Sequence, residues 1–234
     1  THSYKGVKIG LDCANGSTWM IAKSVFDALG ADTYVIGNRP DGLNINVDCG
    51  STHLGALQEL VRENGLDVGF AFDGDADRCL LSDENGVQID GDQVLAVCGR
   101  TMKAAGKLPG NTVVATVMSN IGLHNFVKEN GMQIVTTSVG DRNVLEEMLA
   151  HGYVIGGEQS GHTIFLDFAT TGDGELSALQ FLQLLHRSGL KASQLVEDCK
   201  RYPQELINVA VNGNPQKESI MTSEWLAAAV KEQE

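Results

Sequence analysis

The stretch Asp67–Arg78, with the sequence DVGFAFDGDADR, decides the fold of this chain. Its first part is an almost unbroken apolar run, which predicts a buried strand over Asp67–Phe72. Its second part places the carboxylates of Asp73, Asp75 and Asp77 at alternate positions directly after that strand. Open α/β sheets bind ligands outside the carboxyl ends of their strands. The stretch therefore predicts an α/β domain with an acidic loop where a ligand would bind.

The segments on either side of this stretch extend the same pattern. Val7–Asp12 predicts a strand, and Ser17 or Thr18 is expected to cap the helix that follows it. After the acidic loop, Cys79–Ser82 and Val87–Ile89 flank a Glu-Asn-Gly turn, which predicts a hairpin. The hairpin makes the expected sheet a mixed one.

Strands and helical patterns alternate along most of the chain, and most of the helical patterns end at a glycine. The order starts again after Lys107–Gly110, which has the composition of a linker. This repetition predicts two similar three-layer α/β/α domains with mixed, largely parallel sheets. The expected parts are residues 1–106, residues 107–203, and a linker with the start of a further domain over residues 204–234. In that last part, Leu206–Val211 alternates like a strand.

The composition excludes several classes of partner. Thirty acidic and 17 basic residues give a formal net charge of −13, whereas nucleic-acid-binding proteins carry a basic footprint. No apolar run approaches the roughly 18 residues of a membrane helix. The five cysteines are widely spaced and form no C-x-x-C pair, which is typical of reduced thiols in a cytosolic protein. We therefore expect a cytoplasmic protein with no nucleic-acid or membrane partner.

The acidic loop is the strongest candidate for a functional site. Carboxylates that converge after a buried strand repel one another unless a cation lies between them, and Mg²⁺ prefers such oxygen ligands. We therefore expect Asp73, Asp75 and Asp77 to bind Mg²⁺. Arg78 is expected either to pair with a phosphate or to hold one of the carboxylates. The alternative is a solvated acidic turn, and the spacing does not match a calcium-binding EF-hand loop.

A second candidate is the glycine-rich segment Gly156–His162. It presents Glu158, Ser160 and His162 at alternate positions after a predicted strand. A flexible turn with acceptors and donors on one side suits the recognition of a polyol. Such loops are common, so from the residues alone an ordinary polar turn is the stronger interpretation.

Two further loops precede predicted helices. Val139–Arg142 lies at a strand-to-helix junction, where a helix N-terminus favours anions and Arg142 could hold a phosphate. The alternative, which the spacing favours, is that Asp141 caps the helix and Arg142 is solvated. Thr170–Gly174 is interpreted as a cap and hinge, with substrate contact as the weaker alternative.

Together these segments resemble the α-D-phosphohexomutase family across nearly the whole chain. The matching segments are KIGLDCANG at 8–16, DGDADR at 73–78, VGDR at 139–142, GEQSGH at 157–162 and TTGDG at 170–174. The first two resemble the family's second domain with its magnesium loop, and the others resemble its third domain. The segment GEQSGH at 157–162 resembles the sugar loop of that third domain. Within the family, its Gln159-Ser160-Gly161-His162 form is most similar to the sugar loop of bacterial phosphoglucosamine mutases.

The resemblance implies a reaction and an enzyme class, an intramolecular phosphotransferase. The expected reaction interconverts glucosamine 6-phosphate and glucosamine 1-phosphate through a phosphoserine and a bisphosphorylated intermediate. The product would enter UDP-N-acetylglucosamine and cell-wall synthesis. The alternatives are a phosphoglucomutase or phosphomannomutase, and a non-catalytic module that binds sugar phosphate or metal.

The resemblance also implies a role for each site residue. Asp73, Asp75 and Asp77 would bind Mg²⁺, and Arg78 would lie beside the phosphoserine. The substrate-binding set would be Glu158 and Ser160 on the sugar hydroxyls, His162 in support of that loop or of the substrate, and Asp141 and Arg142 in a substrate-facing loop.

Two departures from the family pattern shape these expectations. Asn143 stands where the family usually has tyrosine, and this difference weakens the expectation that Arg142 binds substrate. The family's serine loop and the phosphate loop of its fourth domain do not occur in these residues. We therefore expect a fragment without domains one and four that does not turn over substrate alone. Its uncovered apolar surface leaves aggregation or a homodimer as an open alternative.

Overall fold

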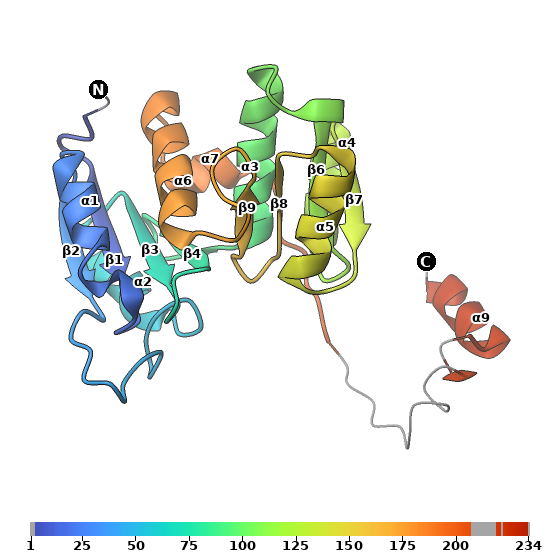
Figure 1. Cartoon of the computed structure of the whole chain (residues 1–234), viewed down its shortest axis with the longest axis horizontal. Coiled ribbons are helices and arrows are strands. Elements are labelled where there is room, and N and C mark those ends of the chain that lie inside the picture. The colour runs from blue at the N-terminus through green and yellow to red at the C-terminus, as the bar shows by residue number, and fades with distance from the viewer. Residues whose placement is uncertain (1–2, 207–218, 221, 234) are drawn as a thin grey trace. The chain divides into compact units, whose positions relative to one another are not determined.

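The computed structural model describes residues 3–206, 219–220 and 222–233. Residues 3–202 form one compact unit, and the described residues from Pro203 onward belong to a second, which contains the helix α9 (Glu224–Gln233). Most of the strand expected over Leu206–Val211 lies outside the described residues. Figure 1 labels the elements along the chain.

A mixed sheet organises the first part of the larger unit. Its strands lie in the order β2-β1-β3-β4-β5, with β1 parallel to β2 and β3, and with β4 antiparallel to β3 and β5. The strands are β1 (Lys8–Asp12), β2 (Asp32–Ile36), β3 (Val68–Phe72), β4 (Cys79–Asp83) and β5 (Gln88–Ile89). The first strands are parallel and the last are a hairpin, as the sequence predicts.

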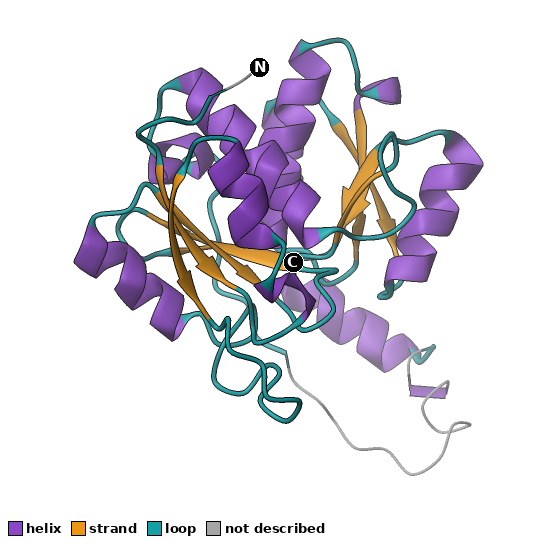
Figure 2. Cartoon of the chain, turned by 60° about the vertical axis from the view of Figure 1, so that its left-hand side comes forward, coloured by secondary structure: helices purple, strands orange, loops and turns teal. Residues whose placement is uncertain are grey.

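Helices cover both faces of this sheet. On one face, α2 (Gly55–Asn64) packs Leu57 and Val61 against Ala71 of β3. On the other face lies α1 (Ala22–Ala28), whose Phe26 ring stacks on Phe70 at 5.8 Å. These contacts produce a three-layer arrangement, which is also visible in Figure 2.

A second sheet repeats the plan with fewer strands. Its order is β7-β6-β8-β9, with β6 parallel to β7 and β8, and with β9 antiparallel to β8. The strands are β6 (Thr112–Thr116), β7 (Gln133–Thr137), β8 (Ile155–Gly157) and β9 (Thr163–Phe165). The helices of this part are α3 (Gly91–Ala104), α4 (Ile121–Glu129), α5 (Asp141–His151), α6 (Gly174–Ser188) and α7 (Ala192–Val196). These two α/β/α arrangements, each built on a mixed sheet, confirm the predicted fold class.

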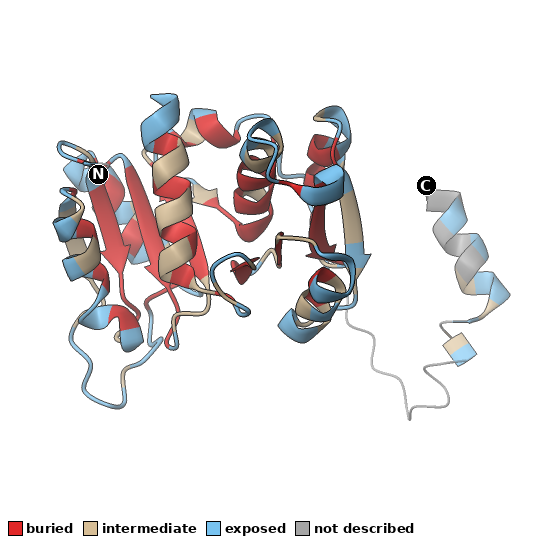
Figure 3. Cartoon of the chain, turned by 45° about the horizontal axis from the view of Figure 1, so that its top comes forward, coloured by how far each residue is buried: buried red, intermediate tan, exposed pale blue. Residues whose placement is uncertain are grey.

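One apolar core runs through both sheets. Leu95 of α3 and Phe181 of α6 belong to the same buried cluster as Leu11 of β1 and Val113 of β6. Helix α6 contacts α3 and also β3 and β4 of the first sheet. Figure 3 shows the buried strands on both sides of these helices. The helices α3 and α6 therefore join the two sheets into one unit.

The start of the first helix differs from the prediction. Ser17–Trp19 forms a 3₁₀ turn, and the α-helix begins only at Ala22. Thr18 is buried and its hydroxyl donates to the carbonyl oxygen of Cys13 at 3.4 Å, so it is not available as a helix cap. Helix α7 has no counterpart among the predicted elements, because its five residues are too few to show a period.

The cysteines are thiols in the interior of the chain. All five cysteines are buried and free of disulfides, and burial raises the pKa of Cys13 to about 11. In the described part of the chain, no helix is long and apolar enough to cross a bilayer.

A half-buried carboxyl group in the first turn of α6 predicts a pH-dependent stability. Burial, with a smaller contribution from Asp173, raises the pKa of Glu175 to about 7, and its Oε1 has no hydrogen-bond partner. The stabilisation from its protonated form is complete below the unfolded pKa and is lost as the pH rises through about 7. We expect Glu175→Gln to raise the Tm relative to wild type by a few degrees at pH 7.5, since about 1 kcal/mol shifts the Tm of such a domain by roughly 2–4 °C. Thermal melts at pH 4.5 should show a much smaller difference, and a difference that is the same at both pH values would contradict the prediction.

Candidate functional site

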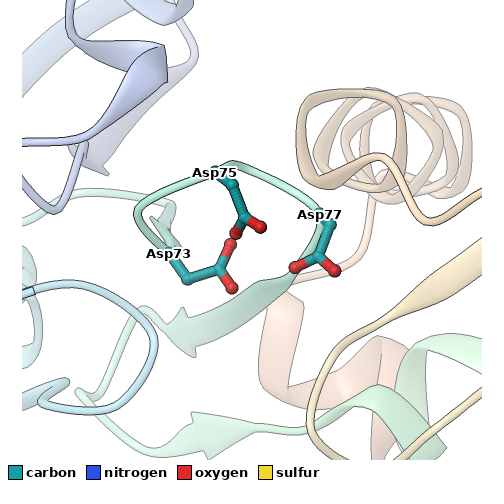
Figure 4. A group of neighbouring side chains, drawn as sticks. All are labelled: Asp73, Asp75 and Asp77. Atoms are coloured by element: carbon teal, nitrogen blue, oxygen red, sulfur yellow. The ribbon is translucent and has the colours of Figure 1, made fainter. Parts of the chain in front are cut away.

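Three carboxylates meet in the loop that follows β3. Carboxylate oxygens of Asp73, Asp75 and Asp77 all lie within 4.8 Å of one another, and Figure 4 shows the three side chains inside one turn of the chain. Asp73 is buried, Asp77 is half-buried and Asp75 is exposed. The prediction that these three residues converge is therefore confirmed, and the group opens to solvent on the Asp75 side.

The backbone of the loop is held in a tight turn. The N–H of Ala76, which has a left-handed φ of +66°, donates to the carbonyl oxygen of Asp73 at 3.2 Å. The N–H of Arg78 donates to Asp73 Oδ1 at 3.2 Å. From outside, the N–H of Ser17 donates to the carbonyl oxygen of Gly74 at 2.9 Å, and a side chain at Gly16 would collide with Gly74. The turn at Gly16 thus fixes the loop that carries the acids.

The charges of this loop are incompletely compensated. Burial, followed by interaction with Asp77 and the charge of Asp75, raises the pKa of Asp73 to about 6. The nearest cationic atom, Arg78 Nε, lies 3.9 Å from Asp73 Oδ2 and 3.8 Å from Asp77 Oδ1, and neither distance is that of a hydrogen bond. Asp77 Oδ1 is buried without any hydrogen-bond partner. Clustered oxygen donors with an orphaned carboxylate atom fit a hard divalent cation.

The predicted sugar loop connects β8 to β9 and contacts the loop before α5. Glu158 Oε1 accepts a hydrogen bond from the N–H of Gly140 at 3.0 Å, and Glu158 Oε2 lies 3.5 Å from the hydroxyl of Ser160. The fold therefore brings the segment before Asp141 next to Glu158.

Arg142 does not join this group. Its side chain is 85% exposed, and its guanidinium pairs with Glu146 one turn along α5 at 2.8 Å. Asp141 Oδ1 accepts from the N–H of Arg142 at 2.8 Å, at the start of the helix. Asn143, where the family usually has tyrosine, donates its side-chain amide to the carbonyl oxygen of Val139 at 2.9 Å. In this structure Asn143 therefore stabilises the loop, and Arg142 lies in solvent.

His162 joins three loops. Its imidazole is buried, its Nδ1 lies 3.1 Å from Asp77 Oδ2, and its Nε2 accepts from the N–H of Gly172 at 3.0 Å. Because a backbone N–H only donates, the ring proton is on Nδ1 and faces Asp77. Neither ring nitrogen is left for a substrate, so the geometry matches the supporting role among the two roles considered for His162. The loop at Gly172 is thereby fixed to the acidic loop.

Backbone contacts reinforce this junction. Arg78 and His162 form an isolated antiparallel bridge, and the N–H of Cys79 donates to the carbonyl oxygen of Gly161 at 3.1 Å. The N–H of Gly174 donates to the carbonyl oxygen of Ala76 at 2.8 Å. Side chains at Gly161 or Gly174 would collide with this backbone. The acidic loop and the predicted sugar loop are therefore in direct backbone contact.

A pocket of about 350 Å³ opens beside the sugar loop. Its lining includes Glu158, Gln159 and Ser160, together with Asp90 and Arg201. Asp90 and Arg201 are lining residues that no motif in the sequence indicates. For Asp90 a capping pattern, Asp followed three residues later by Gln93, marked a helix start, whereas nothing in the sequence connects Arg201 with residues about forty positions earlier.

Comparison with protein families divides the chain between β4 and α3. Residues 1–86 match the model described as phosphoglucomutase/phosphomannomutase, alpha/beta/alpha domain II, and residues 90–202 match domain III of the same family. Helix α3 lies in the second match. The predicted boundary between residues 106 and 107 stays a prediction.

Curated relatives and solved structures agree with these matches. The chain is 53% identical over 230 residues to a phosphoglucosamine mutase of Acetivibrio thermocellus, covering 98% of the chain and 51% of the relative. It is 51% identical to the enzyme of the same name from Caldicellulosiruptor bescii, over 99% of the chain and 51% of the relative. The chain thus spans about half the length of these relatives.

Two solved structures share the fold. A phosphoglucomutase/phosphomannomutase family protein from Burkholderia thailandensis superposes with a TM-score of 0.76 at 26% identity, over 83% of this chain and 43% of that one. The N-acetylphosphoglucosamine mutase of Aspergillus fumigatus, solved with GlcNAc-6P and magnesium, superposes with a TM-score of 0.70 at 19% identity, over 88% and 52%. From the two matched domains, the identities and the shared fold, it follows that this chain belongs to the phosphoglucomutase/phosphomannomutase family and contains its domains II and III.

Proposed function

We propose that the chain forms the metal-binding and sugar-binding part of a phosphoglucosamine mutase, which interconverts glucosamine 6-phosphate and glucosamine 1-phosphate. The observation that carries this proposal is the buried contact between His162 and Asp77, which ties the acidic loop to the sugar loop. A cation and a sugar phosphate bound at these two loops would be neighbours. Phosphoryl transfer depends on such positioning and charge compensation.

The acidic loop would hold Mg²⁺ through Asp73, Asp75 and Asp77. When bound, the ion would neutralise negative charge on a phosphorylated serine, which stabilises phosphoryl transfer. The chain's own part is to keep the acids in place through the turn at Gly74 and the proton that His162 directs at Asp77. Arg78 would add a positive charge beside the acids.

The sugar loop would bind hydroxyl groups. Each carboxylate oxygen of Glu158 has a second acceptor position besides its present contact, and the exposed hydroxyl of Ser160 can both donate and accept. Two adjacent hydroxyl groups of a hexose match this pair. The substrate loop before α5 would lie against Glu158 through Gly140.

The amino sugar is the proposed substrate for two reasons. Relatives whose sequences are 53% and 51% identical to this chain carry the name phosphoglucosamine mutase. In addition, the pocket contains the acids Glu158 and Asp90 but only the single base Arg201, which favours a protonated amino group over a neutral hydroxyl group. The product would supply UDP-N-acetylglucosamine and cell-wall synthesis in the cytoplasm. A phosphoglucomutase or phosphomannomutase is the alternative activity.

The substrate assignment predicts a selective turnover. The test uses an enzyme that contains this chain and has the full length of the relatives. For that enzyme we expect kcat/KM with glucosamine 6-phosphate to be at least about tenfold higher than with glucose 6-phosphate or mannose 6-phosphate, which corresponds to about 1.4 kcal/mol. A coupled assay of each sugar phosphate measures this. The 234 residues alone should show no turnover, because no serine loop of the family type occurs in them. Turnover by this chain alone, or a preference for a neutral hexose phosphate, would contradict the proposal.

The metal assignment predicts the behaviour of Asp75→Ala. Removal of one of three crowded carboxylates should leave the Tm in chelator equal or higher, because repulsion falls. Wild type should gain roughly 2.7 kcal/mol of stability at a Mg²⁺ concentration about 100-fold above its Kd, and the variant should lose this gain. Thermal melts with and without Mg²⁺ measure both effects.

Glu129→Ala is the matched control, because Glu129 is an exposed acid at the end of α4, outside the acidic loop. It should respond to Mg²⁺ as wild type does. Strong destabilisation of Asp75→Ala in chelator would instead assign Asp75 a structural role.

The supporting role of His162 predicts a coupled loss. His162→Ala leaves the buried N–H of Gly172 without its acceptor, which costs about 1–3 kcal/mol, and it removes the donor to Asp77. We expect a lower Tm together with several-fold weaker Mg²⁺ binding by titration calorimetry. His151→Ala, at an exposed histidine on α5, should change neither. Unchanged Mg²⁺ affinity in the His162 variant would mean that the junction does not position the metal ligands.

A further inference from the structure

A second polar junction lies behind the sugar loop, on the carboxylate of Asp90. Asp90 is 2% exposed and caps α3, with Oδ1 accepting from the N–H of Gln93 at 3.1 Å. Its other oxygen, Oδ2, accepts from the side-chain amide of Gln159 at 3.3 Å. The same oxygen lies 3.7 Å from Nε of Arg201. One buried oxygen atom therefore serves both the sugar loop and a residue near the end of the unit.

The sugar loop is held at Gln159 from both its backbone and its side chain. The N–H of Gly91, in the first turn of α3, donates to the carbonyl oxygen of Gln159 at 3.0 Å. A side chain at Gly91 would collide with the carbonyl oxygen of Glu158. Gln159 thus anchors the loop, while its neighbours Glu158 and Ser160 line the pocket.

The segment 199–202 is also fixed at both ends. The side-chain amide of Gln93 donates to the carbonyl oxygen of Cys199 at 3.1 Å. Asn120 donates to the carbonyl oxygen of Tyr202 at 2.8 Å and accepts from its N–H at 3.0 Å. Arg201 therefore extends toward Asp90 from a backbone that has little freedom. Its side chain is 52% exposed, so its replacement does not disturb a core.

We propose that Gln159 and Arg201 are positioning residues that act through Asp90, so that the segment 199–202 sets the pose of Glu158 and Ser160. Within the described part of the chain, Arg201 forms neither a hydrogen bond nor an ion pair with Glu158 or Ser160, and its ion pair is with Asp90. Its effect on them passes through the shared carboxylate oxygen. The consequence for ligand affinity rests on the proposed function of the sugar loop, whereas the coupling itself does not.

The coupling is tested without ligand. In the 234-residue chain, Arg201→Met should shift the backbone amide NMR signals of residues 158–161 and should speed hydrogen exchange at Gly161, whose N–H donates to the carbonyl oxygen of Glu158. Arg201→Lys keeps the charge and should restore most of the wild-type signals. Arg62→Met is the matched control, because Arg62 is an exposed arginine on α2, outside both the segment 199–202 and the sugar loop. Unshifted signals in Arg201→Met, or equal shifts in the control, would overturn the proposal.

The consequence for the ligand is tested separately with glucosamine 6-phosphate. Arg201→Met and Gln159→Met each remove a polar contact to Asp90 Oδ2, an ion pair in the first case and a hydrogen bond in the second. Each should weaken binding about three- to tenfold, and the double variant should bind no more weakly than the poorer single variant. Mg²⁺ affinity should stay at the wild-type value in all three. Additive losses, or weaker binding by Arg201→Met with an undisturbed loop, would mean that Arg201 contacts the ligand directly and would overturn the positioning role. If wild type binds no glucosamine 6-phosphate, the proposed function fails, while the amide signals still decide the coupling.

Discussion

The site depends on a buried imidazole whose two nitrogens are both used within the protein. Through Nδ1, His162 directs a proton at Asp77, and through Nε2 it holds the N–H of Gly172. Three loops from two sheets are thereby fixed at one point. A carboxylate cluster with a pKa of about 6 at Asp73 needs such external support, because its own charges act to open it. The supporting contacts come from polar groups of the second sheet's loops, so the acidic loop and the loop between β8 and β9 share one framework.

Both sheets place their functional loops by the same device. Each has a set of parallel strands followed by an antiparallel strand, at β3–β4 and at β8–β9. The acidic loop lies in the first of these reversals and the sugar loop in the second. Arg78 and His162, one residue from each, pair as a β-bridge. Glycines at the contact allow the two backbones to approach closely. The contact between the two loops therefore depends on these glycines as well as on the polar side chains.

Local periodicity and glycine positions predicted most of the elements and the convergence of Asp73, Asp75 and Asp77, because these features depend on neighbours in the chain. The start of the first helix was wrong because the Thr18 hydroxyl turns inward to Cys13, a tertiary contact that propensity does not contain. The choice for His162 between supporting the loop and contacting substrate depended on Gly172 and Asp77, the latter 85 positions away. The positions of Asp90 and Arg201 beside the sugar loop could not be predicted for the same reason. No local pattern marks either residue as part of a site, and both reach the sugar loop through contacts between segments distant in the sequence.

The continuous core has a consequence for modularity. Family matches divide the chain near residue 86, yet α6 from the second match packs on β3 and β4 of the first, and residues of both share one apolar cluster. The evolutionary unit and the cooperative folding unit therefore differ. A chimera that exchanges one matched domain for that of a distant homologue must also graft the surface of α6, and denaturant should melt both sheets in a single transition.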